Sequence, residues 1–344
     1  MKIVIDKSIP FIEGVFEPYS EVVYKDGEDI CRSDLITADA LIVRTRTKCD
    51  GKLLRGTSVK MIATATIGTD HIDSDYCNRH RIFTTNAAGC NSGGVMNYVF
   101  SALYGIAARK SISLSDATIG IIGVGNVGGK VEKAARNLGF KVLLCDPPRA
   151  KAEGEQNFCE LDYLLKNSDI VTLHVPLNKK TKGMADERFF SKMKVGAFFI
   201  NAARGGLVKE SALLNAIPKL GPVVIDTWKN EPDINRKLMD KVDIATPHIA
   251  GYSYQGKQIG TSMVVRSIAR FFGFNELFDF FPSATDKELE AVKLEYKDRD
   301  QGGIASTIQY NYPIFTDDFM LRMQPEAFEE LRKKYKYRRE FYID

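Results

Sequence analysis

The sequence has few residues of the kinds that bind metals or cross-link a chain. Its 344 residues include six cysteines and four histidines. The cysteines form no CxxC pair, and none has the spacing to a histidine that is typical of a zinc site. We therefore expect no metal site, and free, mostly buried thiols in a reducing compartment.

Long apolar runs and a strong charge imbalance are also missing. No apolar stretch approaches the ~20 residues that cross a bilayer, and the first residues carry no secretory signal pattern. The net charge is only +4, which gives no general attraction to nucleic acid. We expect a cytoplasmic protein that binds neither membranes nor nucleic acid. One basic run, residues 332–339, is interspersed with tyrosines and flanked by acids, so we interpret it as a solvated helix face rather than a polyanion site.

A glycine turn is the most informative feature that is present. An apolar strand over residues 119–122 is followed by Gly123, Gly125 and Gly128 in the spacing GxGxxG. The first glycine permits a tight turn, the second lets the backbone approach a pyrophosphate, and the third lets helix and strand pack closely. This pattern predicts a dinucleotide site.

The residues after the turn indicate which dinucleotide binds. A helix that begins at Asn126 and Val127 offers free backbone N–H groups to a pyrophosphate. Asp146 lies near the ~20-residue offset at which a carboxylate holds the ribose hydroxyls of NAD and repels the 2′-phosphate of NADP. Arg149 leaves an alternative open, since an arginine nearby can accept that phosphate; we interpret it as a solvated loop charge. The sequence thus predicts NAD.

Short apolar strands alternate with helical patterns over the first 250 residues, which is typical of parallel sheets covered by helices on both faces. Helices over residues 92–108 and 260–272 are expected to carry the chain from one domain to the next and back. The strands that we expect are residues 3–5, 40–43, 61–65, 82–84, 118–122, 141–145, 170–173, 197–200, 223–225 and 244–245.

These crossings predict an α/β protein of three domains. A discontinuous, flavodoxin-like substrate (lid) domain covers residues 1–93 and 254–280, and a Rossmann NAD-binding domain covers residues 94–253. Residues 281–344 form a small α+β domain that we expect to complete its core against a second copy of the chain, giving a homodimer.

Two elements are expected in this C-terminal part of the chain. Residues 307–312 alternate like a strand, and residues 325–337 resemble a helix that begins with proline. A disordered tail is the alternative, but the many aromatic residues argue against it.

Three charged residues follow predicted strands, where the loops at the carboxyl edge of a parallel sheet converge. They are Arg204 in NAARGG, Glu231 in WKNEP and His248 in PHIAG. Arg204 can hold a carboxylate in a bidentate fork. His248 can take a hydroxyl proton while hydride leaves for nicotinamide, and Glu231 can orient it. This set suits the oxidation of a 2-hydroxy acid, and Asp226 lies where an acid could reach the nicotinamide carboxamide.

The other three histidines have plainer interpretations. His71 and His174 lie in or beside apolar segments, so we expect hydrogen-bonded packing residues, and His80 is expected to be exposed. The alternative for Arg204 is a surface charge, and the alternative for Glu231 is an ordinary turn residue.

The glycine turn and the loops of Arg204, Glu231 and His248 together resemble the D-2-hydroxyacid dehydrogenase family. The resemblance covers most of residues 1–275 and implies NAD-linked hydride transfer with these three residues as the catalytic set. Other segments are similar to one branch of that family, which oxidises 4-phospho-D-erythronate to (R)-3-hydroxy-2-oxo-4-phosphooxybutanoate in pyridoxal 5′-phosphate (vitamin B6) biosynthesis. These segments are residues 64–73, 87–91, 144–150, 248–253 and 312–341.

The resemblance also implies ligand contacts and a partner. Thr45, Thr66 and Tyr252 would contact the substrate, and a 2-oxo acid would serve as the acceptor that reoxidises NADH. Residues implied to line the NAD site are Asp146, Val175, Ala202, Ala203, Arg204, Asp226 and Gly251, of which Val175 stands where a threonine is common.

Arg44 and Arg46 are candidates for the substrate phosphate on chemical grounds. A dianionic phosphate needs several donors, and alternate residues of an extended segment point the same way. Surface charge is the alternative for both. Two further readings of the whole chain stay open: another dehydrogenase of the family, acting on 3-phosphoglycerate or an unphosphorylated 2-hydroxy acid, and a non-catalytic NAD sensor.

Overall fold

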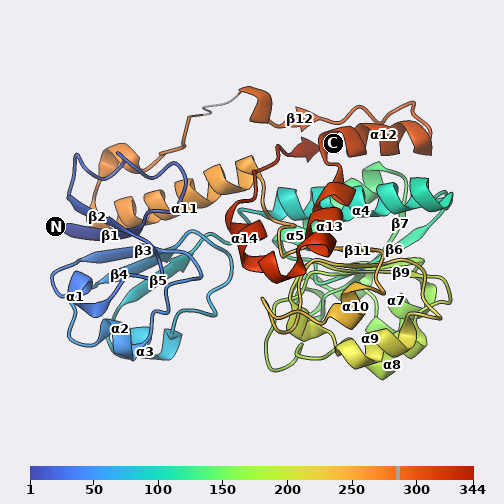
Figure 1. Cartoon of the computed structure of the whole chain (residues 1–344), viewed down its shortest axis with the longest axis horizontal. Helices are drawn as coiled ribbons and strands as arrows, with labels where there is room; N and C mark the ends of the chain where they lie inside the picture. Colours follow the sequence, from blue (N-terminus) through green and yellow to red (C-terminus); the bar gives the residue numbers. More distant parts are fainter. Residues whose placement is uncertain (284–286) are drawn as a thin grey trace. The chain divides into compact units, whose positions relative to one another are not determined.

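The computed structural model of the chain describes residues 1–283 and 287–344, which divide into two compact units (Figure 1). Unit 1 comprises Met1–Asn91 and Tyr254–Glu288, and unit 2 comprises Ser92–Ser253 and Leu289–Asp344. The C-terminal segment, residues 289–344, therefore belongs to unit 2. Its predicted role as a dimerisation domain over residues 281–344, of which 284–286 lie outside the described residues, stays a prediction.

Unit 1 contains a five-stranded parallel sheet in the order β2-β1-β3-β4-β5. One face packs on α11 (Tyr254–Phe272), whose Val264, Val265 and Ile268 join the strand residues in one apolar core. A second core lies under the three short helices of the other face. The remaining elements are β1 (Lys2–Asp6), β2 (Glu21–Lys25), β3 (Ala40–Val43), β4 (Met61–Thr64), β5 (Phe83–Asn86), α1 (Arg32–Leu35), α2 (Gly51–Leu54), α3 (Ser74–Arg79) and η3 (Asn275–Leu277).

Unit 2 contains a six-stranded parallel sheet in the order β11-β10-β9-β8-β6-β7. Alternate residues of its strands enter opposite cores: Ile119 and Ile121 face one, and Ile122 faces the other. The predicted strands are confirmed in both sheets. Those of unit 2 are β6 (Thr118–Ile122), β7 (Lys141–Cys145), β8 (Ile170–Leu173), β9 (Phe198–Asn201), β10 (Val223–Ile225) and β11 (Ile244–Ala245).

Helices cover both faces of this sheet, and α4 (Ser92–Lys110) is buried over nearly its whole length. Within the described residues, no helix combines the length and the apolar character that a bilayer crossing needs. The other elements of the unit before the C-terminal segment are α5 (Asn126–Asn137), α6 (Pro147–Glu153), η1 (Glu155–Asn157), α7 (Leu161–Asn167), α8 (Glu187–Lys192), η2 (Gly205–Leu207), α9 (Glu210–Ala216) and α10 (Arg236–Met239).

The C-terminal segment differs from its predicted elements. Residues 307–312 are not a strand, because 307–311 belong to α12 (Gln301–Asn311) and Tyr312 is its C-cap. This helix buries Ala305 and Ile308 in the core shared with α4. The helix expected over 325–337 ends early, as the 3-10 helix η5 (Pro325–Ala327) followed by α14 (Phe328–Lys333). The other elements are η4 (Lys287–Leu289), β12 (Val292–Lys293), α13 (Ile314–Met323) and β13 (Phe341–Tyr342).

Glu340 is buried beside two of the three places where the chain passes from one unit to the other. The Ser253 hydroxyl donates to its Oε1 at 2.6 Å, and a Cβ on Gly93 would lie 2.0 Å from its Oε2. The next residue, Phe341, is held by the Asn97 side chain, which donates to its carbonyl at 2.8 Å and accepts from its N–H at 3.0 Å. The end of the chain is therefore fixed to the start of α4.

Candidate active site

The glycine turn between β6 and α5 is closely packed at two of its glycines and open at the third. Gly123 has φ +87°, in the left-handed region that favours glycine, and a Cβ on Gly128 would lie 2.0 Å from the Gly123 carbonyl oxygen. Gly125 differs, since nothing lies within 4 Å of the position of its missing Cβ. That open space adjoins the N-terminus of the twelve-residue helix α5, where backbone N–H groups favour an anion. The turn fits a dinucleotide pyrophosphate.

Asp146 follows β7 and lies next to the turn. Its Oδ2 accepts the Val124 N–H at 2.7 Å, and its Oδ1 accepts the Arg149 N–H at 3.1 Å. The Arg149 guanidinium forms an ion pair with Glu153 at 2.6 Å and donates to the Val124 carbonyl at 2.7 Å. These contacts favour the plainer interpretation of Arg149 as a surface charge, because an NADP phosphate would have to compete with Glu153. Arg149 lies in the helix α6 and not in a loop as we expected.

His248 and Glu231 form a hydrogen-bonded pair. His248 Nδ1 lies 2.7 Å from Glu231 Oε2, and the other carboxylate oxygen accepts the Trp228 N–H at 2.9 Å. Burial acts to raise the pKa of Glu231, but the bond to His248, its charge, the Trp228 N–H and Arg332 outweigh this and lower it. An ionised carboxylate can only accept in this hydrogen bond, so Nδ1 is the donor and Nε2 is the ring nitrogen that faces away from Glu231.

The backbone around His248 is in a sparsely populated conformation and is tied down. His248 has φ +57°, uncommon for a residue with a side chain, and its N–H donates to the Asp226 carbonyl at 2.8 Å. The Asp226 carboxylate accepts the N–H groups of Ile249 at 2.8 Å and Ala250 at 3.0 Å. Burial raises the pKa of Asp226. The Asp226 carboxylate, which we expect near the nicotinamide carboxamide, is thus also a buried hydrogen-bond acceptor for the His248 turn.

Arg204 lies in a loop held close to the Glu231 loop. The Asn201 side chain accepts the Ala203 N–H and donates to the Arg204 carbonyl, both at 3.1 Å. A Cβ on Gly205 would lie 2.0 Å from the backbone carbonyl of Trp228, so only glycine allows this approach. The half-buried Arg204 donates to the Ala203 carbonyl at 2.8 Å. Unit 2 therefore carries Arg204, Glu231 and His248 on loops after β9, β10 and β11.

The residues predicted to hold the substrate in unit 1 follow β3 and β4 at the carboxyl edge of its sheet. Thr45 and Arg46 are exposed, and the Arg46 guanidinium lies 3.6 Å from Glu28. Arg44 is paired with the buried Asp6 at 3.0 Å. The Thr66 hydroxyl is 2.7 Å from that of Thr64. The structure thus places these candidates along one edge of unit 1.

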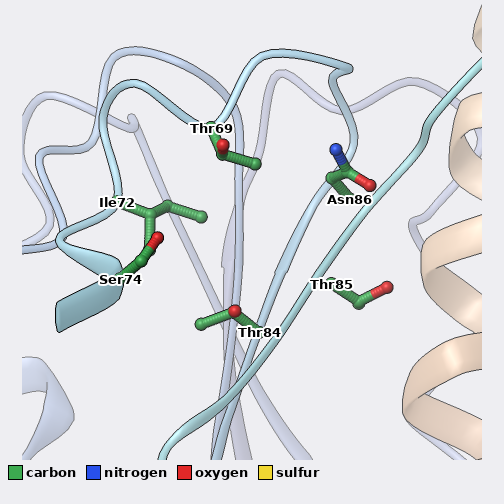
Figure 2. A pocket seen from close by; sticks show the side chains of 6 residues that line it. All are labelled: Thr69, Ile72, Ser74, Thr84, Thr85 and Asn86. Atoms are coloured by element: carbon green, nitrogen blue, oxygen red, sulfur yellow. The ribbon is translucent and has the colours of Figure 1, made fainter. Parts of the chain in front are cut away.

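A polar cavity of about 320 Å³ lies at the same edge of unit 1, beside β5 (Figure 2). None of the predicted site residues lines it. Its lining residues are Thr69, Ile72, Ser74, Thr84, Thr85 and Asn86.

The histidines outside the pair behave in three ways. His174 Nε2 lies 3.0 Å from the Thr172 hydroxyl, as expected of a packing residue, and burial lowers its pKa to about 3. His80 is exposed, as expected. The expectation of a hydrogen-bonded His71 is wrong, because neither of its ring nitrogens has a hydrogen-bond partner within the part of the chain that the structure describes. Within the same residues, no three histidine, cysteine or acidic side chains gather as a metal site would require.

The basic run 332–339 is not the solvated helix face that we expected. Arg332 Nη1 lies 4.0 Å from Glu231 Oε2 and 3.1 Å from Glu329. Tyr335 and Tyr337 pack against Tyr252, with ring centroids 5.9 and 6.3 Å apart. The sequence did contain a signal that this segment packs against the rest of the protein. Tyrosines lie between its basic residues, and burying their rings is favourable, whereas a fully solvated face would leave them exposed to water.

Comparison with known proteins places the chain in a family. Residues 103–250 match the family described as D-isomer specific 2-hydroxyacid dehydrogenase, NAD binding domain. Erythronate-4-phosphate dehydrogenase of Bacteroides thetaiotaomicron is 45% identical over 99% of this chain and 97% of its own length. The enzyme of the same name from Shigella boydii is 40% identical over 99% of this chain and 92% of its own. The chain belongs to the erythronate-4-phosphate dehydrogenase family.

Solved structures of related dehydrogenases share the fold. D-lactate dehydrogenase from Aquifex aeolicus, complexed with NAD and lactic acid, is 26% identical with a TM-score of 0.66 and covers 83% of this chain and 100% of its own. NAD+-bound 3-phosphoglycerate dehydrogenase from Entamoeba histolytica is 27% identical with a TM-score of 0.67, covering 81% and 97%. As a member of the erythronate-4-phosphate dehydrogenase family, the chain is an NAD-dependent dehydrogenase with a Rossmann NAD-binding domain.

Proposed function

We propose that the chain oxidises 4-phospho-D-erythronate to its 2-oxo acid with NAD, as a step of pyridoxal 5′-phosphate biosynthesis. The observation that carries this proposal is the 40–45% identity, over 99% of the chain, to erythronate-4-phosphate dehydrogenases. The bonded pair of His248 and Glu231, at 2.7 Å, supports it with the acid–base chemistry that the reaction needs.

In this proposal His248 is the general base. Its Nε2 accepts the proton of the C2 hydroxyl, while Glu231 keeps Nδ1 protonated and stabilises the imidazolium that forms. Arg204 binds the substrate carboxylate through its planar fork and polarises the oxygen at C2. When bound, NAD supplies the hydride acceptor.

The NAD site would use the glycine turn for the pyrophosphate and Asp146 for the ribose hydroxyls. Asn126 and Val127 begin the helix whose N–H groups face that pyrophosphate. The remaining residues that we propose along the cofactor are Val175, Ala202, Ala203, Arg204, Asp226 and Gly251. The substrate contacts that we propose are Arg44, Thr45, Arg46, Thr66 and Tyr252.

We also propose that the chain is a homodimer formed through its C-terminal segment. Large apolar side chains on neighbouring helices support this: Tyr310 of α12 is 80% exposed, and Phe319 and Met323 of α13 are 58% and 61% exposed. Sedimentation should give a dimer, and Tyr310→Ser with Met323→Ser should shift it towards monomer. A monodisperse monomer of the unaltered chain would contradict the proposal.

Two further proposals concern the setting of the reaction. A 2-oxo acid would reoxidise tightly held NADH, in which case dialysed protein should retain bound nicotinamide. We also propose a reducing compartment, the cytoplasm, because the cysteines form no CxxC pair and none has the spacing to a histidine that is typical of a zinc site.

The test of the function is nicotinamide absorbance after the purified protein is mixed with NAD and 4-phospho-D-erythronate. Parallel samples contain 3-phosphoglycerate or D-lactate, each with and without 2-oxoglutarate. We expect NADH, or consumption of 2-oxoglutarate, chiefly with the phosphoerythronate. Preference for another acid would overturn the assigned substrate but leave the proposed mechanism unchanged. NAD binding with no turnover of any acid would favour a sensor.

A further inference from the structure

Arg338, in the C-terminal segment, holds the turn that directly follows His248. Its guanidinium donates to the carbonyl oxygens of Ile249 at 3.1 Å and Tyr252 at 3.0 Å, and to that of Ala250. A fourth bond, 3.1 Å long, reaches the Gly94 carbonyl near the start of α4. Three of the four carbonyls thus belong to the four residues after the candidate base.

The guanidinium is itself fixed by its surroundings. It lies 4.0 Å above the ring of Tyr312 and donates to the Tyr335 hydroxyl at 3.1 Å. Both tyrosine hydroxyls donate to Asp317, at 2.8 and 3.0 Å. The Tyr312 ring and the Tyr335 hydroxyl fix the orientation of the planar guanidinium. In this orientation its N–H groups can donate to several backbone carbonyls at once.

The turn is held from a second side by Asp226. That carboxylate accepts the N–H groups of Ile249 and Ala250, while Arg338 donates to the carbonyls of the same two residues. A residue with φ +57° needs such support, because the conformation is unfavourable for a side chain such as that of His248.

We propose that Arg338 is a positioning residue: it fixes the residue 249–252 turn so that His248 stays paired with Glu231 and presents Nε2 to the substrate. The inference rests on the proposed function of His248 as the base. The residues that match the 2-hydroxyacid dehydrogenase domain end at 250, so this support comes from a segment outside the shared domain.

The test compares Arg338→Ala and Arg338→Lys with Arg339→Ala. Arg339 is the matched control, because it is the adjacent arginine and its guanidinium donates to the Asn311 side chain. We expect Arg338→Ala to lower kcat by about 100-fold, as a small misplacement of a catalytic group does. Arg338→Lys should be intermediate, since an ammonium cannot reproduce the fork.

Chemical rescue provides the second measurement. Guanidinium ion at a concentration far below denaturing should restore part of the kcat of Arg338→Ala and leave Arg339→Ala unchanged. A loss of activity caused by general unfolding would not be rescued, and thermal unfolding of each variant checks for it. Equal kcat for Arg338→Ala and Arg339→Ala would overturn the proposal.

Histidine NMR separates this inference from the proposed function, because it needs no turnover. The chain has four histidines, and the His248→Asn spectrum assigns the His248 ring. In Arg338→Ala the His248 Nδ1–H signal should shift or broaden, while His71, His80 and His174 keep theirs. An unchanged His248 signal would contradict the positioning role of Arg338, even if the unaltered enzyme turns over its substrate.

Discussion

The two units share an architecture but differ in how the loops at the carboxyl edges of their sheets are held by hydrogen bonds. Each is a parallel sheet with helices on both faces and polar residues at its carboxyl edge. In unit 2 the loops are tied to one another, since Asp226 and Arg338 hold the turn after His248 from two sides. In unit 1 the candidate residues Thr45 and Arg46 are exposed.

This difference separates two requirements of a dehydrogenase. A base and its orienting carboxylate need fixed geometry, which unit 2 provides through buried bonds. Residues that hold the far end of a substrate add binding energy and tolerate more freedom. The same sheet architecture serves both because the chemistry lies in the loops and not in the fold.

The strongest way to break the comparison is to remove one histidine from each unit. His248→Asn should lower kcat by about 1,000-fold, within the range for loss of a general base, and leave NAD binding intact. His80→Asn, at an exposed position of unit 1, should leave kcat unchanged. Steady-state kinetics of the two variants decides, and an equal loss in both would remove the assignment of the base to unit 2.

Two adjacent glycines sharpen the contrast between close packing and open space within unit 2. Gly128→Ala places a Cβ 2.0 Å from the Gly123 carbonyl, whereas Gly129→Ala meets nothing within 4 Å. We expect the first to lower the free energy of unfolding by about 1–3 kcal/mol and to weaken NAD binding. The second should raise it by about 0.4–1 kcal/mol, through the unfolded chain. Urea unfolding measures the free energy of unfolding of both variants. A change of the same sign in both would contradict the packing argument.

For unit 1, Arg46→Ala should raise KM for 4-phospho-D-erythronate about tenfold, the loss of one charge-assisted hydrogen bond, with a smaller change in kcat. A contact remote from the reacting carbon contributes mainly uniform binding. Lys48→Ala, which removes a more exposed cation two residues away, is the control. If KM stays constant in both variants, Arg46 is a surface charge.

The smallest effect concerns the charge of Glu231. A carboxyl whose pKa is lower in the folded chain, as that of Glu231 is, stabilises the fold above about pH 4.3, the ordinary value for glutamate. That contribution is lost as the pH falls towards the folded value. Glu231→Gln should therefore lower Tm by about 2–4 °C at pH 7, and the difference should narrow as the pH falls through 4. If the difference in Tm instead widens at acid pH, the pKa of Glu231 is raised and not lowered in the folded chain.

Local patterns predicted the sheets well because each buried strand is a short apolar run between turn residues. Glu21–Lys25 was not predicted as a strand: β2 lies at the edge of its sheet, and none of its residues is fully buried. Residues 307–312 were predicted as a strand from six alternating residues. Over a longer window, Ala305, Ile308 and Tyr312 are the buried positions, and that spacing is helical.

The candidate site was predictable only where the residues lie within short motifs. Arg204, Glu231 and His248 each follow a strand, so the topology of a parallel sheet places their loops at one edge. Arg338 is 90 residues beyond His248 along the chain, and the hydrogen bonds that join it to the turn involve backbone carbonyls. Since every residue has a carbonyl, no side-chain pattern marks such a contact.

The buried carboxylate of Glu340 gives the last few residues an importance that their position in the chain conceals. It lies against Gly93 and Ser253, next to two of the three peptide segments that link the units. A protein shortened by five residues would lose this carboxylate together with the Phe341 backbone that Asn97 holds. The far end of the chain is therefore a poor place for trimming or for a fused tag, and an affinity tag belongs at the other terminus.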